Sequence, residues 1–264
     1  MARRSHTVGV IGLGFGRAHI PAFQACGSTV VAVCQRNLAG AKAIAERYGI
    51  PQVFERWEDL LEQARPEIVV IATPPHLRRQ VCLRALSVGM HVLCEKPLAL
   101  NMNEAREMME AAAATNRVGG TVFNFRYPAA MQRMHQMGAD GFLGRVFHVS
   151  CSFSGARYAD ESMPATWRVD RSLAGVGAMG DFGVHVVDSV RWNFGEFARV
   201  CAQTGIAYPS RQLPAGTKAA DAEDYCTLLA DLDSGAQATL SVSRAARGAN
   251  GDFLVDAYGS QGAL

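Results

Sequence analysis

The sequence predicts an α/β fold in which a doubly wound parallel sheet is followed by an α+β domain with a mainly antiparallel, open sheet. Up to about residue 125, short and almost purely apolar runs alternate with segments of helical period. Beyond that point the strand-like runs alternate apolar and polar residues. We therefore predict two domains, residues 1–125 and 126–264, and a chain with 49% hydrophobic residues can supply a core to each.

The first half contains five runs typical of strands that are buried on both faces of a parallel sheet. These runs are Thr7–Ile11, Thr29–Val33, Ile68–Ala72, His91–Cys94 and Thr121–Phe123. Between them, apolar residues recur at helical spacing over residues 41–48 and 102–112. This alternation predicts right-handed βαβ units.

The second half has a different strand pattern. Residues 145–153 place Phe147, Val149, Cys151 and Phe153 against polar neighbours. Residues 225–232 and 236–242 flank the turn Asp233-Ser234-Gly235, and a further strand is predicted over 253–258. Such half-polar strands favour a mainly antiparallel sheet with one covered face. The other face carries apolar residues that need cover, so we expect a homo-oligomer, a dimer or tetramer, that forms through this sheet.

Net charge and cysteine usage narrow the classes of binding partner and the cellular compartment that we expect. The net charge is +2 from 26 basic and 24 acidic residues, which predicts no nucleic-acid or membrane-surface binding and leaves a small molecule as the expected partner. The seven cysteines occur singly, without a CxxC pair, so we expect reduced thiols, a cytoplasmic location and no metal site. The opening residues lack the apolar segment and cleavage site of a signal peptide, so we expect none, and no run reaches the ~20 apolar residues that a membrane span requires.

A glycine-rich turn follows the first predicted strand and opens a helix. Gly12-Leu13-Gly14 has the spacing of a dinucleotide-binding turn, in which the first glycine allows the bend and the second lets backbone N–H groups reach a pyrophosphate. The third small residue is out of register, because the usual site falls on Arg17 and is flanked by Gly16 and Ala18. The context still favours a Rossmann domain over a glycine turn that binds another ligand.

The residues after the second predicted strand bear on the choice between NAD and NADP. An acid usually binds the adenosine ribose here, but the sequence has Gln35 and Arg36. Gln35 can hydrogen-bond a ribose and Arg36 can pair with a 2′-phosphate, which favours NADP slightly over NAD. The alternative is that Arg36 is an exposed residue that stacks on adenine or contacts nothing.

Two further segments carry groups suited to acid–base chemistry. Lys96 follows a buried strand, at the edge of the sheet where open α/β folds bind ligands. Asp181, His185 and Asp188 recur at spacings of four and three on a probable helix and share one face. From spacing alone, Lys96 is as compatible with a solvated strand end, and the helix with a polar stripe.

Together these segments resemble the glucose–fructose oxidoreductase/inositol dehydrogenase/rhizopine-catabolism (Gfo/Idh/MocA) family. The resemblance is carried by Gly12-Leu13-Gly14, Ala72-Thr73-Pro74-Pro75-His76, Glu95-Lys96-Pro97-Leu98-Ala99, Asn124-Phe125-Arg126 and Gly180-Asp181-Phe182-Gly183-Val184-His185-Val186-Val187-Asp188. Weaker similarity continues at Glu223-Asp224-Tyr225 and at residues 258–264. The segments follow the family's order along almost the whole chain.

The resemblance implies an NAD(P)-dependent oxidoreductase that transfers a hydride between a nicotinamide and a secondary alcohol or ketone of a sugar, inositol or related polyol. It implies that Lys96 and His185 face the substrate, with Asp181 nearby as a third catalytic residue. His185 would accept the hydroxyl proton, and Lys96 would hydrogen-bond the reacting oxygen. Cofactor contacts are expected from Gly12, Gly14, Phe15, Gly16, Gln35, Arg36, Thr73, Pro74, His76, Glu95, Asn124 and Arg126.

Substrate contacts are expected from Tyr158, Trp167 and Arg168 besides the catalytic residues, but this composition suits many ligands. Two other functions stay open: a sensor that binds a dinucleotide without turnover, and a reductase of a non-sugar carbonyl or imine. The chain departs from the family at the shifted glycine, at Gln35 and at Arg78, where relatives often have histidine. It also ends earlier than most members, so we expect the second domain to be C-terminally truncated relative to the family.

Overall fold

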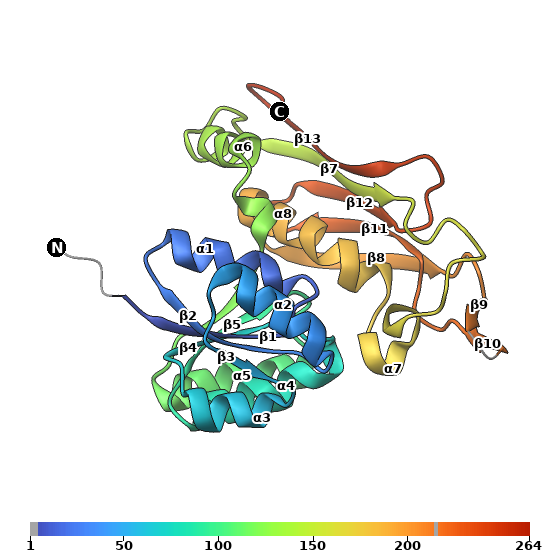
Figure 1. Cartoon of the computed structure of the whole chain (residues 1–264). Helices are drawn as coiled ribbons and strands as arrows, with labels where there is room; N and C mark the ends of the chain where they lie inside the picture. The colour runs from blue at the N-terminus through green and yellow to red at the C-terminus, as the bar shows by residue number, and fades with distance from the viewer. Residues whose placement is uncertain (1–4, 214–215) are drawn as a thin grey trace. The chain divides into compact units, whose positions relative to one another are not determined.

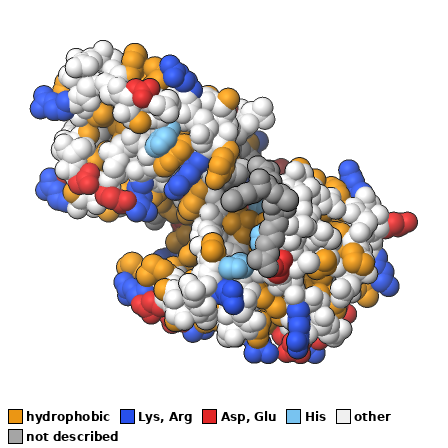
Figure 2. Space-filling view, turned by 90° about the vertical axis from the view of Figure 1, so that its left-hand side faces the viewer, with side chains coloured by type: hydrophobic (Ala, Val, Ile, Leu, Met, Phe, Trp, Pro, Cys, Tyr) orange, Lys and Arg blue, Asp and Glu red, His pale blue; other side chains and the backbone are white. Residues whose placement is uncertain are grey.

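The computed structural model of the chain describes residues 5–213 and 216–264 and divides into two compact units, Met1–Val122 and Phe123–Leu264. On the face drawn in Figure 2, basic and acidic side chains are interspersed, in keeping with the small net charge. Among the described residues, the structure contains no helix whose length and hydrophobicity would let it span a membrane.

The first unit contains a six-stranded sheet in the order β3-β2-β1-β4-β5-β6, and every neighbouring pair is parallel. Its strands are β1 (Thr7–Ile11), β2 (Thr29–Cys34), β3 (Gln52–Phe54), β4 (Ile68–Ile71), β5 (His91–Glu95) and β6 (Gly119–Val122). This confirms the predicted doubly wound sheet. Strand order reverses between β1 and β4, which creates the switch point where such sheets bind ligands beyond the carboxyl ends of the strands.

Helices cover both faces of this sheet (Figure 1). They are η1 (Gly16–Ala18), α1 (His19–Ala25), α2 (Leu38–Tyr48), α3 (Trp57–Asp59), η2 (Leu60–Ala64), α4 (Pro75–Ser87) and α5 (Met102–Thr115). Ile20 of α1 and Ala45 of α2 pack with Val10 on one face, whereas Val81 of α4 and Met108 of α5 belong to the cluster on the other. Burial on both faces explains why these strands are almost purely apolar.

The second unit contains a five-stranded sheet in the order β13-β7-β12-β11-β8. Its strands are β7 (Val146–Gly155), β8 (Phe197–Gly205), β11 (Tyr225–Leu232), β12 (Gln237–Ser243) and β13 (Asn250–Gly259). Only β12 and β7 pair in parallel among these neighbours, so the sheet is mainly antiparallel, as predicted. A separate hairpin pairs β9 (Ser210–Leu213) with β10 (Gly216–Ala219).

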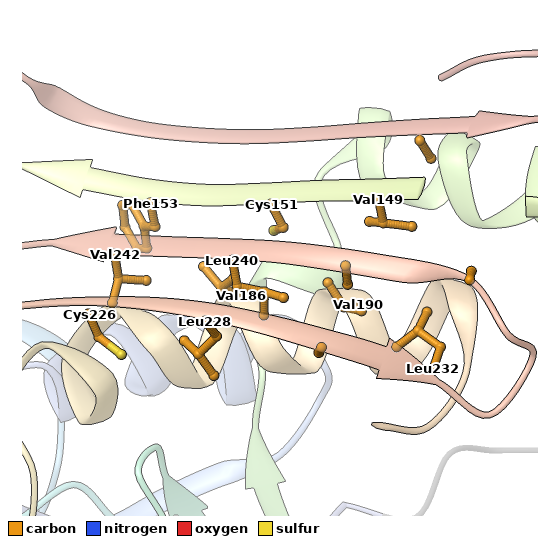
Figure 3. Close-up of a cluster of buried hydrophobic side chains, with 14 of the residues drawn as sticks. Val149, Cys151, Phe153, Val186, Val190, Cys226, Leu228, Leu232, Leu240 and Val242 are labelled. Carbon is orange, nitrogen blue, oxygen red and sulfur yellow. The ribbon is translucent and has the colours of Figure 1, made fainter. Parts of the chain in front are cut away.

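One face of this sheet is covered by helices. The helices of the unit are η3 (Asn124–Arg126), α6 (Ala129–Ala139), η4 (Trp167–Val169), α7 (Arg171–Ala174), η5 (Met179–Gly183) and α8 (Val184–Phe194). Figure 3 shows Val186 and Val190 of α8 beneath Leu240 and the neighbouring strand residues, and these side chains form one buried cluster. The same packing fixes α8, which carries His185, against the sheet.

Candidate functional site

The glycine-rich turn lies at the switch point of the first unit. Gly12 has a φ of +90°, and a Cβ there would lie 2.7 Å from the backbone of Ala72, at the end of β4. Its N–H donates to the carbonyl of Cys34, at the end of β2, over 2.9 Å. Only glycine satisfies this conformation and this close approach, so Gly12 makes the bend that brings the turn across the strand ends.

The two following glycines have different surroundings. A Cβ on Gly14 would meet no atom within 4 Å, so the backbone here is open to a ligand. A Cβ on Gly16 would lie 2.9 Å from the Cβ of Ala72. Gly16, displaced by one position in the sequence motif, therefore allows the close packing of helix on strand that the third glycine of such a turn provides.

These surroundings fit a dinucleotide. The open backbone at Gly14 precedes η1 and α1, and Phe15 beside it is 60% exposed. Thr73, in the turn after β4, is buried, and its Oγ1 has no hydrogen-bond partner among the described residues. A turn with accessible N–H groups and an unsatisfied hydroxyl nearby provides groups to bind a pyrophosphate and an adjoining polar moiety.

The segment after β2 carries the residues expected at the adenosine ribose. The N–H of Gln35 donates to the carbonyl of Phe54 over 3.1 Å, and Asn37 caps α2 by accepting from the N–H of Gly40 over 3.1 Å. Arg36 between them is exposed. Its backbone is therefore fixed while its guanidinium is accessible.

A buried network holds the loop that carries Lys96. Oε1 of Glu95 lies 2.7 Å from Nε2 of His19, and Oε2 of Glu95 accepts from the N–H of Lys96 over 3.2 Å. Glu95 is buried and Lys96 is half-buried. Glu95 thus links the helix after the glycine turn to the loop of Lys96. His19 was not among the predicted site residues, because its contact with Glu95 joins segments far apart in the sequence.

Arg78 connects two of the predicted segments. It is buried on α4, and its Nε donates to the carbonyl of Thr73 over 2.8 Å. Its Nη1 donates to the carbonyls of Glu95, over 2.5 Å, and of Pro97. The departure from the family at Arg78 therefore ties the Thr73 turn to the Lys96 loop. His76 and Pro74 lie at the start of the same helix, both half-buried.

In the second unit, His185 lies in the first turn of α8, which directly follows the π-helical turn η5 that contains Asp181. His185 is buried and stacks on the ring of Phe125, with centroids 4.2 Å apart and planes at 16°. Asp181 and His185 follow Gly177 in the chain. A Cβ on Gly177 would lie 2.0 Å from the carbonyl oxygen of Glu223. The glycine-rich approach therefore lets the chain pass close to Glu223, in the segment before β11, and continue into η5 and α8.

Three predicted substrate residues form one group. Nε of Arg168 lies 3.8 Å from a carboxylate oxygen of Asp181, and the guanidinium lies over the ring of Trp167 at 4.3 Å from its centroid. The side chains of Arg168 and Asp181 remain partly accessible, at 29% and 19%. A donor, an acceptor and an aromatic surface therefore lie together, as a polyol site requires.

Tyr158 has a different environment from these three residues. Its side chain is buried, with its hydroxyl 3.2 Å from Oγ1 of Thr166. The guanidinium groups of Arg211 and Arg244 lie over its ring, 5.6 and 4.5 Å from the centroid. The carbonyl of Tyr158 accepts from Nη2 of Arg211 over 2.8 Å. Tyr158 therefore supports the loop of Trp167 and Arg168 from within, and a contact between its ring and a substrate would require displacement of this packing.

Asn124 and Arg126 both belong to η3 but differ in their contacts. Asn124 is exposed. Arg126 donates from Nε and Nη2 to the two carboxylate oxygens of Asp188, over 2.8 and 2.5 Å. This hydrogen bond raises the pKa of Arg126, and the guanidinium stays charged.

The buried cysteines do not have the properties of nucleophiles. Burial raises the pKa of Cys34 and of Cys94 to about 12 and that of Cys82 to about 11. A nucleophilic cysteine needs the thiolate near neutral pH, and these thiols remain protonated there. Among the described residues, no three His, Cys, Asp or Glu side chains are grouped so that they could hold a metal ion.

The chain matches two domain families, one over each half. Residues 6–122 match the family described as "Oxidoreductase family, NAD-binding Rossmann fold", and residues 131–264 match the "GFO/IDH/MocA C-terminal domain". Levoglucosan dehydrogenase of Pseudarthrobacter phenanthrenivorans is 29% identical over 281 residues, which cover 97% of this chain and 72% of that protein. The 1,5-anhydro-D-fructose reductase of Ensifer adhaerens is 34% identical over 178 residues, which cover 66% of this chain and 51% of the reductase.

Solved structures are similar over the same extent. A levoglucosan dehydrogenase in complex with NADH and levoglucosan superposes with a TM-score of 0.94 at 29% identity, covering 98% of this chain and 72% of that chain. Both the parallel sheet and the mixed sheet are thus shared with a structure that contains a dinucleotide and a sugar.

Proposed function

This chain belongs to the Gfo/Idh/MocA oxidoreductase family, and on that premise we propose that it transfers a hydride between a nicotinamide dinucleotide and a secondary alcohol or ketone of a sugar or related polyol. The observation that carries the proposal is the turn at Gly12 and Gly14, which offers open backbone at the switch point of a parallel sheet. Similarity to levoglucosan dehydrogenase and 1,5-anhydro-D-fructose reductase supports a sugar substrate.

We assign the chemistry to His185, Lys96 and Asp181. In the oxidation direction, His185 accepts the proton of the substrate hydroxyl through its imidazole. The Lys96 ammonium hydrogen-bonds the same oxygen and stabilises the negative charge that develops on it. Asp181 orients the imidazole or binds a neighbouring hydroxyl. The nicotinamide, when bound, accepts the hydride in oxidation or supplies it in reduction.

The cofactor is held by the groups that line the carboxyl ends of β1 and β4. The backbone at Gly12, Gly14 and Gly16 receives the pyrophosphate, with Phe15 beside it. Thr73, Pro74 and His76 contact the nicotinamide half, and Glu95 fixes the adjacent loop. Asn124 of η3 adds a polar contact to the cofactor.

A substrate screen tests the proposal. Sugars and polyols, including levoglucosan, are incubated with NAD⁺ or NADP⁺, and cyclic imines and other carbonyl compounds with NADH or NADPH. Formation or consumption of the reduced nicotinamide is followed by its absorbance. We expect turnover with at least one pyranose or cyclic polyol and loss of turnover in His185→Ala. If the reduced dinucleotides bind, but sugars, cyclic imines and other carbonyl compounds all fail to turn over, the sensor function replaces the enzyme.

The choice of dinucleotide gives a separate prediction. We expect NADPH to bind more tightly than NADH, because the accessible Arg36 can pair with the 2′-phosphate and Gln35 does not repel it. Arg36→Ala should lower the NADPH/NADH affinity ratio, and Gln35→Asp should reverse the preference. Titration of both cofactors measures the ratio. Arg47→Ala, at the other end of α2, is the control, and an unchanged ratio in Arg36→Ala removes Arg36 from the site.

The open sheet of the second unit gives another prediction. Val149 and Cys151 of β7 face the helices, so the alternate residues of each strand form the other face, which includes Leu229 and Leu254, each 60% exposed. We propose that this face forms a homo-oligomer contact. Leu229→Lys combined with Leu254→Lys should lower the mass measured by light scattering, whereas Val118→Lys, on the first unit, should not. A wild type that is monomeric at high concentration contradicts the proposal.

A further inference from the structure

His185 is enclosed by phenylalanine rings. Its imidazole stacks face to face on Phe125, and the edges of Phe123 and Phe153 approach it at centroid distances of 6.3 Å each, with planes at 89° and 61°. His185 itself is 4% exposed. Rotation of an imidazole about its last side-chain bond is soft, because that torsion has only broad minima. A ring stacked on one face therefore restricts the direction in which the two nitrogens point.

The residue next to Phe125 is fixed to the helix that carries His185. Arg126 donates two hydrogen bonds to Asp188, which lies three residues after His185 on α8 and is itself buried. The Arg126 guanidinium also lies over the rings of Phe123 and Trp192, at 5.7 and 5.6 Å from their centroids. A bidentate pair of this kind specifies geometry as well as attraction, so η3 is held against α8 at the level of His185.

We propose that Phe125 is a positioning residue for His185 and that the ion pair of Arg126 with Asp188 keeps Phe125 in place. The proposal rests on the proposed role of His185 in proton transfer. It also gives Arg126 a different role from the cofactor contact that the sequence suggested, because its fork of donors is used on Asp188. Rate depends steeply on such alignment, and a displacement of about 1 Å can cost about 100-fold.

The first experiment reads the stack without any turnover. A ring at 4.2 Å shifts the proton resonances of the stacked imidazole upfield, and these can be followed in protein with isotope-labelled histidine. The His185 signals are assigned by their absence in His185→Ala. Their chemical shifts should move downfield in Phe125→Leu and stay close to the wild-type values in Phe125→Tyr. Phe253→Leu is the matched control, because Phe253 packs on Phe125 and Phe153 in the same cluster, with centroid distances of 5.0 and 5.6 Å.

The second experiment reads the consequence for catalysis. In single-turnover hydride transfer with saturating cofactor and substrate, Phe125→Leu should be slowed about 10- to 100-fold, while the dissociation constant of NADH stays within about threefold. Phe125→Tyr should recover most of the rate. Asp188→Asn and Arg126→Met should each slow the step, and the double variant should be little slower than the worse single one.

The outcomes separate this inference from the proposed function. His185 resonances in Phe125→Leu that match the wild type overturn the stack, whatever the enzyme turns over. Shifted resonances with an unchanged rate, or equal rate losses in Phe253→Leu and Phe125→Leu, overturn the positioning role. If no substrate is turned over while the resonances shift as expected, the proposed function fails and the stack on His185 is supported.

Discussion

Replacement of His185 by alanine is expected to lower the rate of hydride transfer by about 10²- to 10⁴-fold, which is the usual contribution of a positioned general acid or base. The dissociation constant of the dinucleotide should remain within about threefold, because the cofactor contacts that we propose lie mostly in the first unit. The fold should be retained, since Val186 and Val190 still anchor α8 in the buried cluster of the sheet. Single-turnover kinetics and a cofactor titration measure the two quantities.

Lys96→Ala should be comparably severe if both groups act on one substrate oxygen. The double variant should then be little slower than the worse single variant, because residues that act as a unit are not additive. Lys42→Ala, exposed on α2, is the control for loss of a lysine, and His148→Ala on β7 is the control for loss of a histidine. Full activity of Lys96→Ala with an established substrate would remove Lys96 from the chemistry, and the loop network of Glu95 and Arg78 would then be structural.

The parallel sheet could be predicted because its strands are buried on both faces and are therefore apolar without interruption. The exceptions are two short strands. β3, Gln52–Phe54, is three residues long, half-buried and begins with a polar residue. β6, Gly119–Val122, is exposed or half-buried and begins with two glycines, so the prediction of Thr121–Phe123 found only its second half. In the second unit, β11 was predicted to the residue, because Cys226, Leu228, Ala230 and Leu232 face the core and alternate with outward residues. The edge strand β8 is exposed along almost its whole length, so burial imposed no alternation there.

The contacts that the candidate site residues make were harder to predict than which segments of the chain carry them. The glycine turn and the Lys96 loop have local signals, since strand ends and glycines are read from neighbouring residues. The pairing of His19 with Glu95 spans 76 residues, and that of Arg126 with Asp188 spans 62, so no local pattern announces either. Tyr158 shows the same limit for a predicted substrate contact. A tyrosine is a residue type that suits a sugar site, but this one packs against Arg211 and Arg244, which are distant in sequence.

Loss of the buried carboxylate of Asp224 is expected to have the largest effect on stability. Its Oδ1 accepts from Nε of Arg244 over 2.9 Å, and its Oδ2 accepts from the N–H of Ala207 over 2.9 Å. The two side chains of the ion pair are only 1–2% exposed. Arg244 further donates to the carbonyls of Arg168 and Ala222, so the pair connects β12 to the loop that carries the substrate residues.

Asp224→Asn keeps the volume but leaves the Arg244 charge buried without its counter-ion, and removing one partner of such a pair typically costs about 3–5 kcal/mol. Chemical denaturation should show a loss of this size in the free energy of unfolding of the second unit. Asp231→Asn is the matched control, because its pair with Arg199 has an arginine side chain 84% exposed, and surface pairs contribute less than about 1 kcal/mol. Arg244→Met combined with Asp224→Leu should cost less than Asp224→Asn, because no charge is then buried alone. Equal losses in Asp224→Asn and Asp231→Asn would show that the buried pair does not stabilise this unit.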